Sequence, residues 1–542
     1  MKNTFKIKSL AAIVALFLVS LSASAQFSGG NGTENNPYII TTPAQLAQLA
    51  TLVNEGNTDY NDKHYKLGND LDLSEYGENF NDGAGWIPIG WYDYYTDTFI
   101  TFKGVFDGNN KIITSLYISN TSFTDIGLFG VLDEGIIKNL GVMDVEVNDN
   151  NTYAWSPCVG GLVGYNLDGL VLNCYITGSI SSSENAGGVV GFNSGRISNC
   201  HSSGKVSAIS NNSVKAGGIV GRNHGLISNC YSTSLINSST IGSSCAGGIT
   251  GYSLDDLTNC YSTGSVTATS SNSDYSYAGG IIGYNYHSSI SNCYSTGLIN
   301  SSSSISVNSC AGGIIGYNYY GSVSNCYSTG LVNSSAYDTS FAGGIVGTNS
   351  SSFGTVSNCA ALNPFINCIG TTIYFGRIAG RLTETLINNI AFNNMINPDG
   401  NANWYNIGED QIDGEDITIE EIHSDGTLGG RFTTENGWTT QNGKLPGLFG
   451  QTVDMPEHLI LTGISNNPLS QTLTAFIQNR TLYISGLIPD EKWYIYSISG
   501  IMVYEDIAVT HSVETRNALS PQLPIGIYII KSGTKTTKII IK

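Results

Sequence analysis

The sequence has 542 residues, of which 65 are Gly, only 12% are charged and 41% are hydrophobic. Glycine without a strict three-residue period excludes collagen, and the hydrophobic fraction excludes a disordered acidic chain. The formal net charge of −19 disfavours nucleic acid as a partner, because binding to a phosphate backbone needs clustered cations.

The first 25 residues have the features of a secretory signal peptide. Three lysines lie among the first eight positions, an apolar run follows at 10–21, and Ala23-Ser24-Ala25 supplies small residues for cleavage. We therefore predict cleavage between Ala25 and Gln26. No other run reaches 18 apolar residues, so we predict no transmembrane helix in the mature chain.

The stretch 42–56 is predicted to form a helix that caps the fold. Thr42 suits the N-cap and Pro43 the first helical turn. Leu46 and Leu49 lie on one face at helical spacing, which favours packing against a core. A cap is expected here because the repeats that follow would otherwise expose open strand edges.

A glycine-rich pattern then recurs with a nearly constant period. Each copy reads Gly-Gly-aliphatic-x-Gly, and the closing glycines lie 27–34 residues apart, at 130, 164, 191, 221, 251, 283, 316, 347 and 380. The runs between them are short and β-type, with turn-forming residues at their ends. A unit of about 31 residues cannot bury its own apolar face, but stacked units can, with equivalent strands about 4.8 Å apart. We therefore predict an all-β fold, a parallel β-solenoid (β-helix) of about nine coils with three short strands per coil.

Each glycine motif is followed by aliphatic-x-Asn-Cys. The aliphatic and Cys positions are three apart, so a straight strand cannot point both inward, and a bend at the Asn would resolve this because Asn tolerates left-handed backbone. We predict an inward structural ladder of reduced thiols rather than disulfides, because the cysteines share one repeat position. The ladder comprises Cys174, Cys200, Cys230, Cys260, Cys293, Cys326 and Cys359. The asparagines just before them are expected to stack as an amide ladder.

A tyrosine follows the cysteine in five copies. These residues are Tyr175, Tyr231, Tyr261, Tyr294 and Tyr327. Next to an inward residue they should point outward and form an exposed stripe beside Ser and Thr hydroxyls. Such a stripe is a candidate binding surface for sugars or proteins; the alternative is that tyrosine merely suits an exposed β surface.

Two motifs in the N-terminal part accompany the repeats. Trp86-Ile87-Pro88-Ile89-Gly90 and Phe102-x-Gly104-x-Phe106-Asp107-Gly108 look like the N-terminal module of GLUG-motif surface proteins, and copies such as Gly343-Gly344-Ile345-Val346-Gly347 resemble the GLUG motif itself. The resemblance covers residues 30–450 and implies an adhesin-like bacterial protein. Such repeats also accompany IgA-cleaving metallopeptidases. No two of the seven histidines lie four apart, which excludes the metallopeptidase motif.

The C-terminal residues have a different pattern. Short alternating runs separated by glycines predict a small antiparallel β-sandwich. Leu482-Tyr483-Ile484, Tyr494-Ile495-Tyr496-Ser497 and the terminal Lys538-Ile539-Ile540-Ile541-Lys542 resemble the sorting domain of the type IX secretion system. That resemblance implies a Bacteroidetes-type bacterium, the type IX machinery as partner, and passage across the outer membrane. The predicted organisation is a signal peptide (1–25), an N-terminal cap with atypical first coils (26–126), the repeat solenoid (127–380), its C-terminal end (381–450), a linker (451–469) and the sorting domain (470–542).

These features predict a secreted or cell-surface protein with a non-enzymatic binding or spacer role, whose ligand would be a glycan or a host or cell-surface protein. The alternative is a carbohydrate-active enzyme of the polysaccharide lyase or hydrolase type, which would need a convergent carboxylate pair in a groove. We predict no catalytic residues and no cofactor. Asp70 and Asp72 resemble half of a calcium site, although turn or edge carboxylates are commoner, and we predict no bound metal.

Overall fold

The protein was analysed as a computed structural model that describes residues 26–93, 97–119, 123–149, 156–271, 275–304, 308–349, 354–381 and 385–461, and the strand residues 474–478, 481–485, 492–497, 502–507, 514–516, 526–532 and 535–541. The predicted signal peptide, residues 1–25 with Ala25 of the cleavage site, lies outside the described residues. The chain divides into two compact units, Met1–Ile460 and Leu461–Lys542.

The N-terminal cap is built around helix α2 (Pro43–Asn54). The Thr42 hydroxyl accepts a hydrogen bond from Gln45 N (3.3 Å), and Leu46 and Leu49 are fully buried. The predicted helix is therefore confirmed, with its N-cap and its apolar face. Next to it lie the 3₁₀ helices η2 (Ser74–Tyr76) and η3 (Asn81–Gly83) and the antiparallel hairpin of β4 (Trp91–Asp93) and β5 (Thr98–Ile100).

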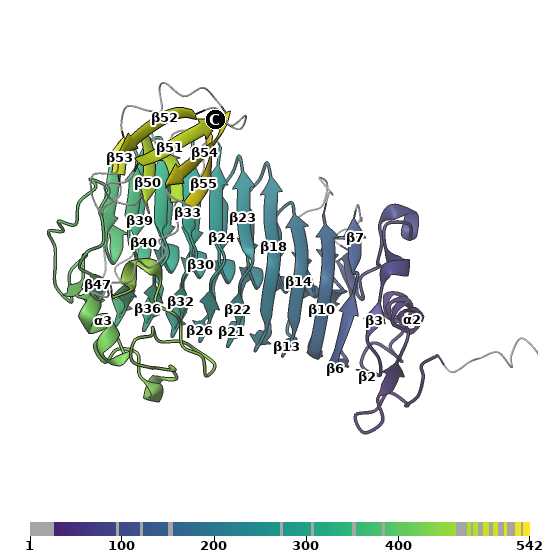
Figure 1. The fold of residues 1–542 in the computed structure, drawn as a ribbon. Coiled ribbons are helices and arrows are strands. Elements are labelled where there is room, and N and C mark those ends of the chain that lie inside the picture. Colours follow the sequence, from purple (N-terminus) through teal and green to yellow (C-terminus); the bar gives the residue numbers. More distant parts are fainter. Residues whose placement is uncertain are drawn as a thin grey trace, which may run out of the picture. The chain divides into compact units, whose positions relative to one another are not determined.

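Most strands of the first unit pair in parallel with their equivalents in the next coil, which confirms the predicted all-β parallel β-solenoid (Figure 1). Within the described residues, 28 strands form a large sheet. Its strands are β1 (Tyr38–Ile40), β2 (His64–Leu67), β3 (Leu71–Asp72), β6 (Val105–Thr114), β7 (Tyr117–Ser119), β10 (Ile136–Asn148), β13 (Leu170–Leu172), β14 (Tyr175–Ser182), β17 (Arg196–Ser198), β18 (His201–Ser210), β21 (Leu226–Ser228), β22 (Tyr231–Ser232), β23 (Leu235–Thr240), β26 (Leu257–Thr258), β27 (Tyr261–Ser262), β28 (Val266–Ser270), β31 (Ser289–Ser291), β32 (Tyr294–Ser295), β33 (Ile299–Ser303), β36 (Ser322–Ser324), β37 (Tyr327–Ser328), β38 (Val332–Ala336), β41 (Thr355–Ser357), β42 (Ala360–Ala361), β43 (Ile366–Ile369), β46 (Thr385–Ile387), β47 (Ile390–Phe392) and β48 (Glu415–Ile417).

Two further sheets of nine strands each complete the coils in the described part of the chain. The second sheet consists of β8 (Asp125–Ile126), β11 (Cys158–Gly160), β15 (Asn185–Gly187), β19 (Val214–Gly217), β24 (Ser244–Gly247), β29 (Ser276–Gly279), β34 (Ser309–Gly312), β39 (Thr339–Gly343) and β44 (Thr372–Gly376). The third sheet consists of β9 (Phe129–Leu132), β12 (Val163–Asn166), β16 (Val190–Asn193), β20 (Val220–Asn223), β25 (Thr250–Ser253), β30 (Ile282–Tyr286), β35 (Ile315–Tyr319), β40 (Val346–Asn349) and β45 (Ala379–Arg381).

The solenoid is longer than the glycine period predicts. It has about 11 turns, against the nine expected from the repeats. The atypical N-terminal strands belong to the same sheet, because Tyr65 of β2 pairs with Phe106 of β6, and Phe106 pairs with Ile137 of β10. Strand pairing therefore continues where the glycine motif is absent.

A bend at asparagine breaks each coil of the large sheet, as predicted. Asn259, for example, has φ 53°, and its equivalents in the neighbouring coils have the same left-handed backbone. Its side-chain amide donates to Asn229 Oδ1 (3.1 Å) and its oxygen accepts from Asn292 Nδ2 (3.2 Å). The predicted amide ladder is confirmed, and it joins successive bends along the coils.

The paired glycines serve a different purpose: they let the second and third sheets fold back against each other. A Cβ on Gly217 would lie 1.9 Å from the Val220 carbonyl oxygen, and a Cβ on Gly221 would lie 2.7 Å from Ala186 N in the preceding coil. Side chains at these positions would push the two backbones apart. Beyond the glycines, the outer faces of both sheets meet in a small second apolar cluster, separate from the main core, that contains Cys245, Tyr277, Cys310 and Phe341.

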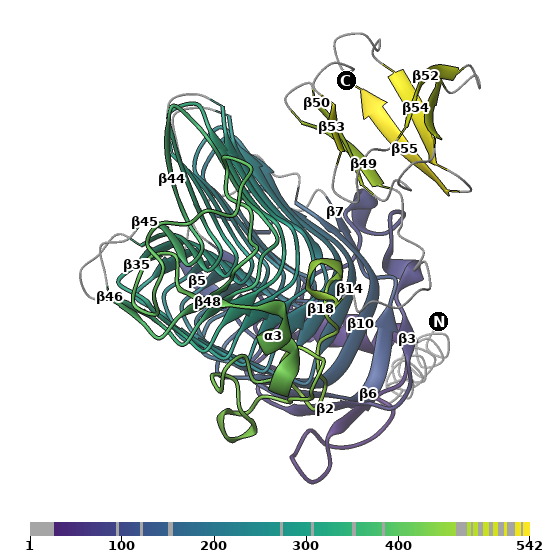
Figure 2. The same ribbon diagram turned by 60° about the vertical axis from the view of Figure 1, so that its left-hand side comes forward.

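After the last coil the chain returns along the solenoid. Helix α3 (Ile419–Asp425) starts with a capping box between Thr418 and Glu421, and the chain continues through the 3₁₀ helices η4 (Thr434–Asn436) and η5 (Glu457–Leu459). The green segment after α3 lies across the coils in Figure 1 and Figure 2. We call residues 428–449 of this return the covering segment.

The second unit contains antiparallel sheets, which is the pairing that its alternating sequence predicts. One sheet pairs β49 (Thr474–Gln478), β50 (Thr481–Ser485) and β53 (Glu514–Arg516). The other contains β51 (Lys492–Ser497), β52 (Met502–Ile507), β54 (Gly526–Ser532) and β55 (Lys535–Ile541).

Candidate binding surfaces

The predicted tyrosine stripe is a ladder of stacked rings on the large sheet. The ring centroids of Tyr231 and Tyr261 are 4.8 Å apart, and those of Tyr261 and Tyr294 are 4.7 Å apart, with the planes almost parallel. The ladder also contains His201, which stacks between Tyr175 (5.2 Å) and Tyr231 (4.6 Å) and which the sequence analysis did not include. Inside the ladder each ring covers the faces of its neighbours, so these rings present their edges and hydroxyls.

The covering segment lies on part of this ladder, so the prediction of five exposed tyrosines is wrong. Tyr327 and Tyr294 are 0% and 5% exposed. Trp438 lies 5.8 Å from the Tyr327 ring and 6.2 Å from the Tyr294 ring, and the Tyr327 hydroxyl donates to the Pro446 carbonyl (2.6 Å). Phe449 extends the cover to Tyr261 (5.8 Å). Only the N-terminal end of the stripe, at Tyr175, lacks this cover among the described residues.

The seven ladder cysteines lie in the main core. All are buried and none forms a disulfide. Their thiols donate to backbone carbonyls two residues earlier, as Cys230 Sγ does to Ser228 O (3.2 Å). Burial raises the pKa of the Cys230 and Cys326 thiols well above the ordinary value, which keeps them protonated. This arrangement fits a packing role rather than thiol chemistry.

A second aromatic surface, absent from the sequence analysis, lies on the outer side of the third sheet. Its main row consists of the middle residues of successive Gly-x-Asn or Gly-x-Ser triplets. These residues are Tyr165, Phe192, Arg222, Tyr252, Tyr284 and Tyr317. Tyr284 stacks on Tyr252 (5.3 Å) and on Tyr317 (5.0 Å), and the last two tyrosines also pack against the second apolar cluster. The Gly-x-Asn triplet was visible in the sequence, but only the fold shows that its middle residues share one face.

Two extra pairs of rings widen this surface at β30 and β35. Tyr286 stacks on Tyr319 (5.2 Å), and His287 stacks on Tyr320 (4.7 Å). His287 and Tyr320 have φ values of 75° and 64°, which are rare for bulky residues. They lie in turns that are one residue longer than the turn Asn223-His224-Gly225. Backbone strain of this kind concentrates at functional sites. We call the main row together with these two pairs the aromatic face.

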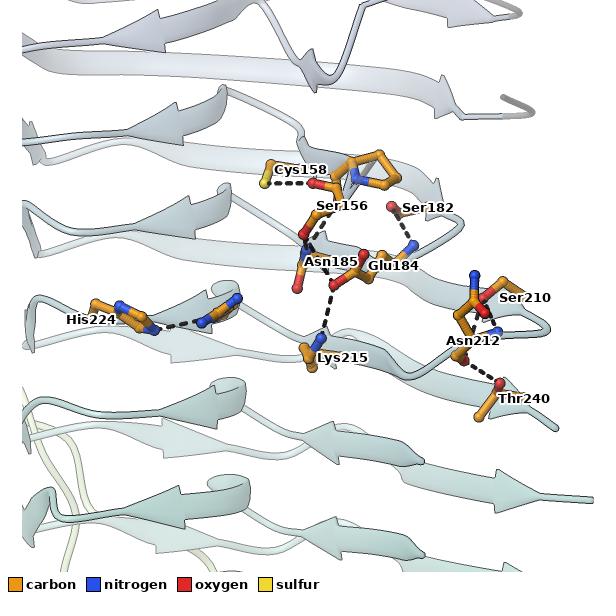
Figure 3. A network of polar contacts seen from close by, with 12 residues as sticks. Ser156, Cys158, Ser182, Glu184, Asn185, Ser210, Asn212, Lys215, His224 and Thr240 are labelled. Atoms are coloured by element: carbon orange, nitrogen blue, oxygen red, sulfur yellow. Dashed lines mark hydrogen bonds and ion pairs between the residues drawn. The ribbon is translucent and has the colours of Figure 1, made fainter. Parts of the chain in front are cut away.

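Figure 3 shows a network of charged and polar side chains around Glu184 and Lys215. Lys215 forms an ion pair with Glu184 of the preceding coil (2.9 Å), and Glu184 also accepts from Ser156 Oγ (3.1 Å). Asp125 is buried on the same sheet, and desolvation raises its pKa to about 7 although the Thr124 hydroxyl donates to it (2.8 Å).

Asp70 and Asp72 act as edge and turn carboxylates. Asp70 Oδ1 accepts from Ile112 N (2.9 Å), and Asp72 accepts from the backbone and hydroxyl of Ser74 (3.0 and 3.1 Å). Among the described residues, no group of three or more His, Cys, Asp or Glu side chains is placed to hold a metal ion. In the same part of the chain, no helix combines the length and apolar character needed to cross a membrane.

Comparison with known proteins agrees with the repeat architecture. The GLUG motif matches at residues 156–181, 182–207, 242–267, 274–306 and 307–333. Two curated proteins are similar to part of the chain: a candidate Gly-rich membrane protein of Evansella cellulosilytica, 35% identical over 31% of this chain, and halomucin of Haloquadratum walsbyi, 32% identical over 30%. The chain spans only 18% and 2% of these relatives.

One solved structure is similar to this chain along most of its length. It is a Bacteroides ovatus protein described as a candidate immunoglobulin A1 protease, with 19% identity, a TM-score of 0.33, and coverage of 79% of this chain and 97% of that one. A similarity at this level carries no argument about function.

Proposed function

We propose that this GLUG-repeat chain is an exported surface protein that binds a glycan through the aromatic face, without catalysing a reaction. The observation that supports this most is the pair of ring stacks at Tyr286–Tyr319 and His287–Tyr320, the second of which is built on turn residues with positive φ. Aromatic rings with hydroxyls offer both apolar contact and hydrogen bonds to sugars. The names of the two relatives, a membrane protein and a halomucin, support a cell-surface location.

The face differs from the covered tyrosine ladder in one respect that matters for binding. The Tyr286–Tyr319 stack has only two rungs, because the equivalent residue in the preceding coil is Leu254. Tyr286 and Tyr319 are partly exposed, whereas Tyr294 and Tyr327 of the long ladder are buried under the covering segment. This is why we move the binding hypothesis from Tyr175 and its equivalents to the third sheet.

A glycan array probed with the exported chain tests the proposal. Replacing both Tyr286 and Tyr319 by Ser should reduce binding about tenfold or more. Stacking of a nucleic-acid base on one aromatic side chain is worth roughly 1–3 kcal/mol, and we expect a loss of this size when a sugar loses both rings. The matched control is Tyr175→Ser, which removes an aromatic ring from the other ladder and should leave binding unchanged. Loss of binding in Tyr175→Ser alone would indicate that the glycan binds the tyrosine stripe instead. Release of shorter sugars from a bound glycan would instead favour the carbohydrate-active enzyme.

We also propose that export uses the signal peptide and then the type IX machinery, with residues 470–542 as the sorting domain. N-terminal sequencing and intact mass of secreted protein test this route. A secreted chain that begins at Gln26 and lacks the C-terminal module supports it, whereas retention in the periplasm contradicts it.

A further inference from the structure

The basic residues between positions 156 and 360 all lie in one coil. Between residues 156 and 360 the sequence contains four Lys and Arg residues: Arg196, Lys205, Lys215 and Arg222. They lie on the consecutive strands β17, β18, β19 and β20. Every other coil in this stretch is without Lys or Arg, and the next arginine in register with the main row is Arg381, two coils beyond Tyr317.

Arg222 is the one of these four that lies in the main row of the aromatic face. It takes the place of a ring: its Cζ lies 5.1 Å from the Phe192 ring centre and 5.8 Å from the Tyr252 ring centre. Its Nε donates to His224 Nε2 (3.0 Å), which fixes the guanidinium between the rings. Burial and the neighbouring Arg222 lower the pKa of His224 to about 4, so the imidazole remains a neutral acceptor.

The charge of Arg222 is not neutralised by the protein. Among the described residues, its guanidinium forms no ion pair with a carboxylate, whereas the nearby Lys215 is paired with Glu184 at 2.9 Å. An arginine that lies between two rings and donates through Nε to His224 can offer its two amino groups to a planar or tetrahedral anion.

We propose that Arg222 binds the carboxylate or sulfate of an acidic sugar within a glycan that lies along the aromatic face. This inference rests on the proposed function and adds the class of sugar. One arginine between Tyr165 and Tyr317 of the main row, in a chain of net charge −19, suits a glycan with isolated acidic sugars better than a dense polyanion.

The spacing of the face favours a glycan over a peptide. Successive rungs lie 5.3 and 5.0 Å apart between Tyr252, Tyr284 and Tyr317. Same-side residues of an extended peptide repeat at about 6.6 Å, twice the strand rise, and lose register with these rungs. The rungs follow the spacing of neighbouring strands, about 4.8 Å, so an extended peptide cannot place one side chain on each rung.

The test compares matched glycans that share one backbone and carry a neutral, a carboxylated or a sulfated sugar. The exported chain is tested as wild type, as Arg222→Gln and as Arg196→Gln, the control that removes an exposed charge from the same coil. Wild type should prefer the acidic glycans about ten- to hundredfold, in line with one charge-assisted hydrogen-bonded contact. Arg222→Gln should lose this preference and keep its affinity for the neutral glycan, and Arg196→Gln should behave as wild type. The carboxylated and sulfated arms show which anion is bound.

Equal binding of neutral and acidic glycans by wild type would overturn the inference and leave the proposed function standing. Absence of binding to every glycan would overturn both. If Arg222→Gln fails to fold, a competition experiment on the wild type replaces it. Free glucuronate or sulfate should reduce the binding of acidic glycans only. An equal reduction for neutral and acidic glycans, or no reduction for either, would refute the inference. Arg222→Lys should recover only part of the preference, because Lys lacks the planar fork.

Discussion

Asp125 offers the sharpest test of how this solenoid tolerates a buried charge. Its carboxyl lies at the start of the second sheet, 4% exposed, and accepts a hydrogen bond from Thr124 Oγ1 (2.8 Å). Desolvation raises its pKa from 3.8 to about 7. The change examined is Asp125→Asn, which keeps the shape and the acceptor for Thr124 but cannot ionise.

The sign of the effect follows from proton binding. Because the folded pKa lies above the unfolded one, the folded state holds the proton more tightly between pH 3.8 and about 7, and stability falls as pH rises through this window. A difference of about three pKa units corresponds to about 4 kcal/mol at 1.36 kcal/mol per unit, which is a ceiling because the site can relax or admit water. Asp125→Asn should therefore stabilise the protein by roughly 2–4 kcal/mol at pH 8 and by less than about 1 kcal/mol at pH 4.

Urea unfolding followed by circular dichroism at pH 4, 6 and 8 measures this difference, with a constant m-value as the check that the unfolded state is unchanged. Asp168→Asn, in an exposed turn, is the control and should be neutral at every pH. An equal effect of Asp125→Asn at pH 4 and pH 8, or a loss of stability at pH 8, would show that the carboxylate is ionised and stabilised in the fold, and would refute the argument.

Three further predictions concern the ladders. Cys260→Asp should cost roughly 3–5 kcal/mol in urea unfolding, because it places an unpaired charge in the core; rapid labelling of the ladder thiols in native protein would contradict their burial. Asn259→Ala should destabilise by about 1–2 kcal/mol more than Asn259→Gly, since only Gly adopts the left-handed bend without strain; equal unfolding midpoints would show that the bend carries no such cost. Tyr327→Phe should cost about 1 kcal/mol through the lost hydrogen bond to Pro446 and should speed proteolysis within the covering segment; an unchanged cleavage rate would mean that this bond does not hold the segment.

Several features follow from the sequence because they repeat with the coil. A residue that recurs once per period must stack on its equivalents in a parallel solenoid, so the period alone predicts the β-helix, the inward cysteines and the Asn bend at Asn259 and its equivalents. The odd offset between Ile197 and Cys200 demands that bend, and the structure has it at Asn199. The helix from Pro43 is equally local, since its N-cap and apolar spacing lie within one short segment.

The parts that the sequence could not determine depend on contacts between segments far apart in the chain. Tyr294 and Tyr327 are buried because Trp438 and Pro446 return over them from more than a hundred positions away, and no periodicity encodes that return. The aromatic face depends on tertiary structure in another way. Its rings alternate with core residues on short strands, and only the glycine-mediated fold-back of the second and third sheets decides which side chains are enclosed and which, like Arg222, remain at the surface. The sequence by itself therefore determined what stacks along the solenoid, because stacking is set by a local repeat, whereas the tertiary structure decided what is covered, because burial depends on where distant chain segments come to lie.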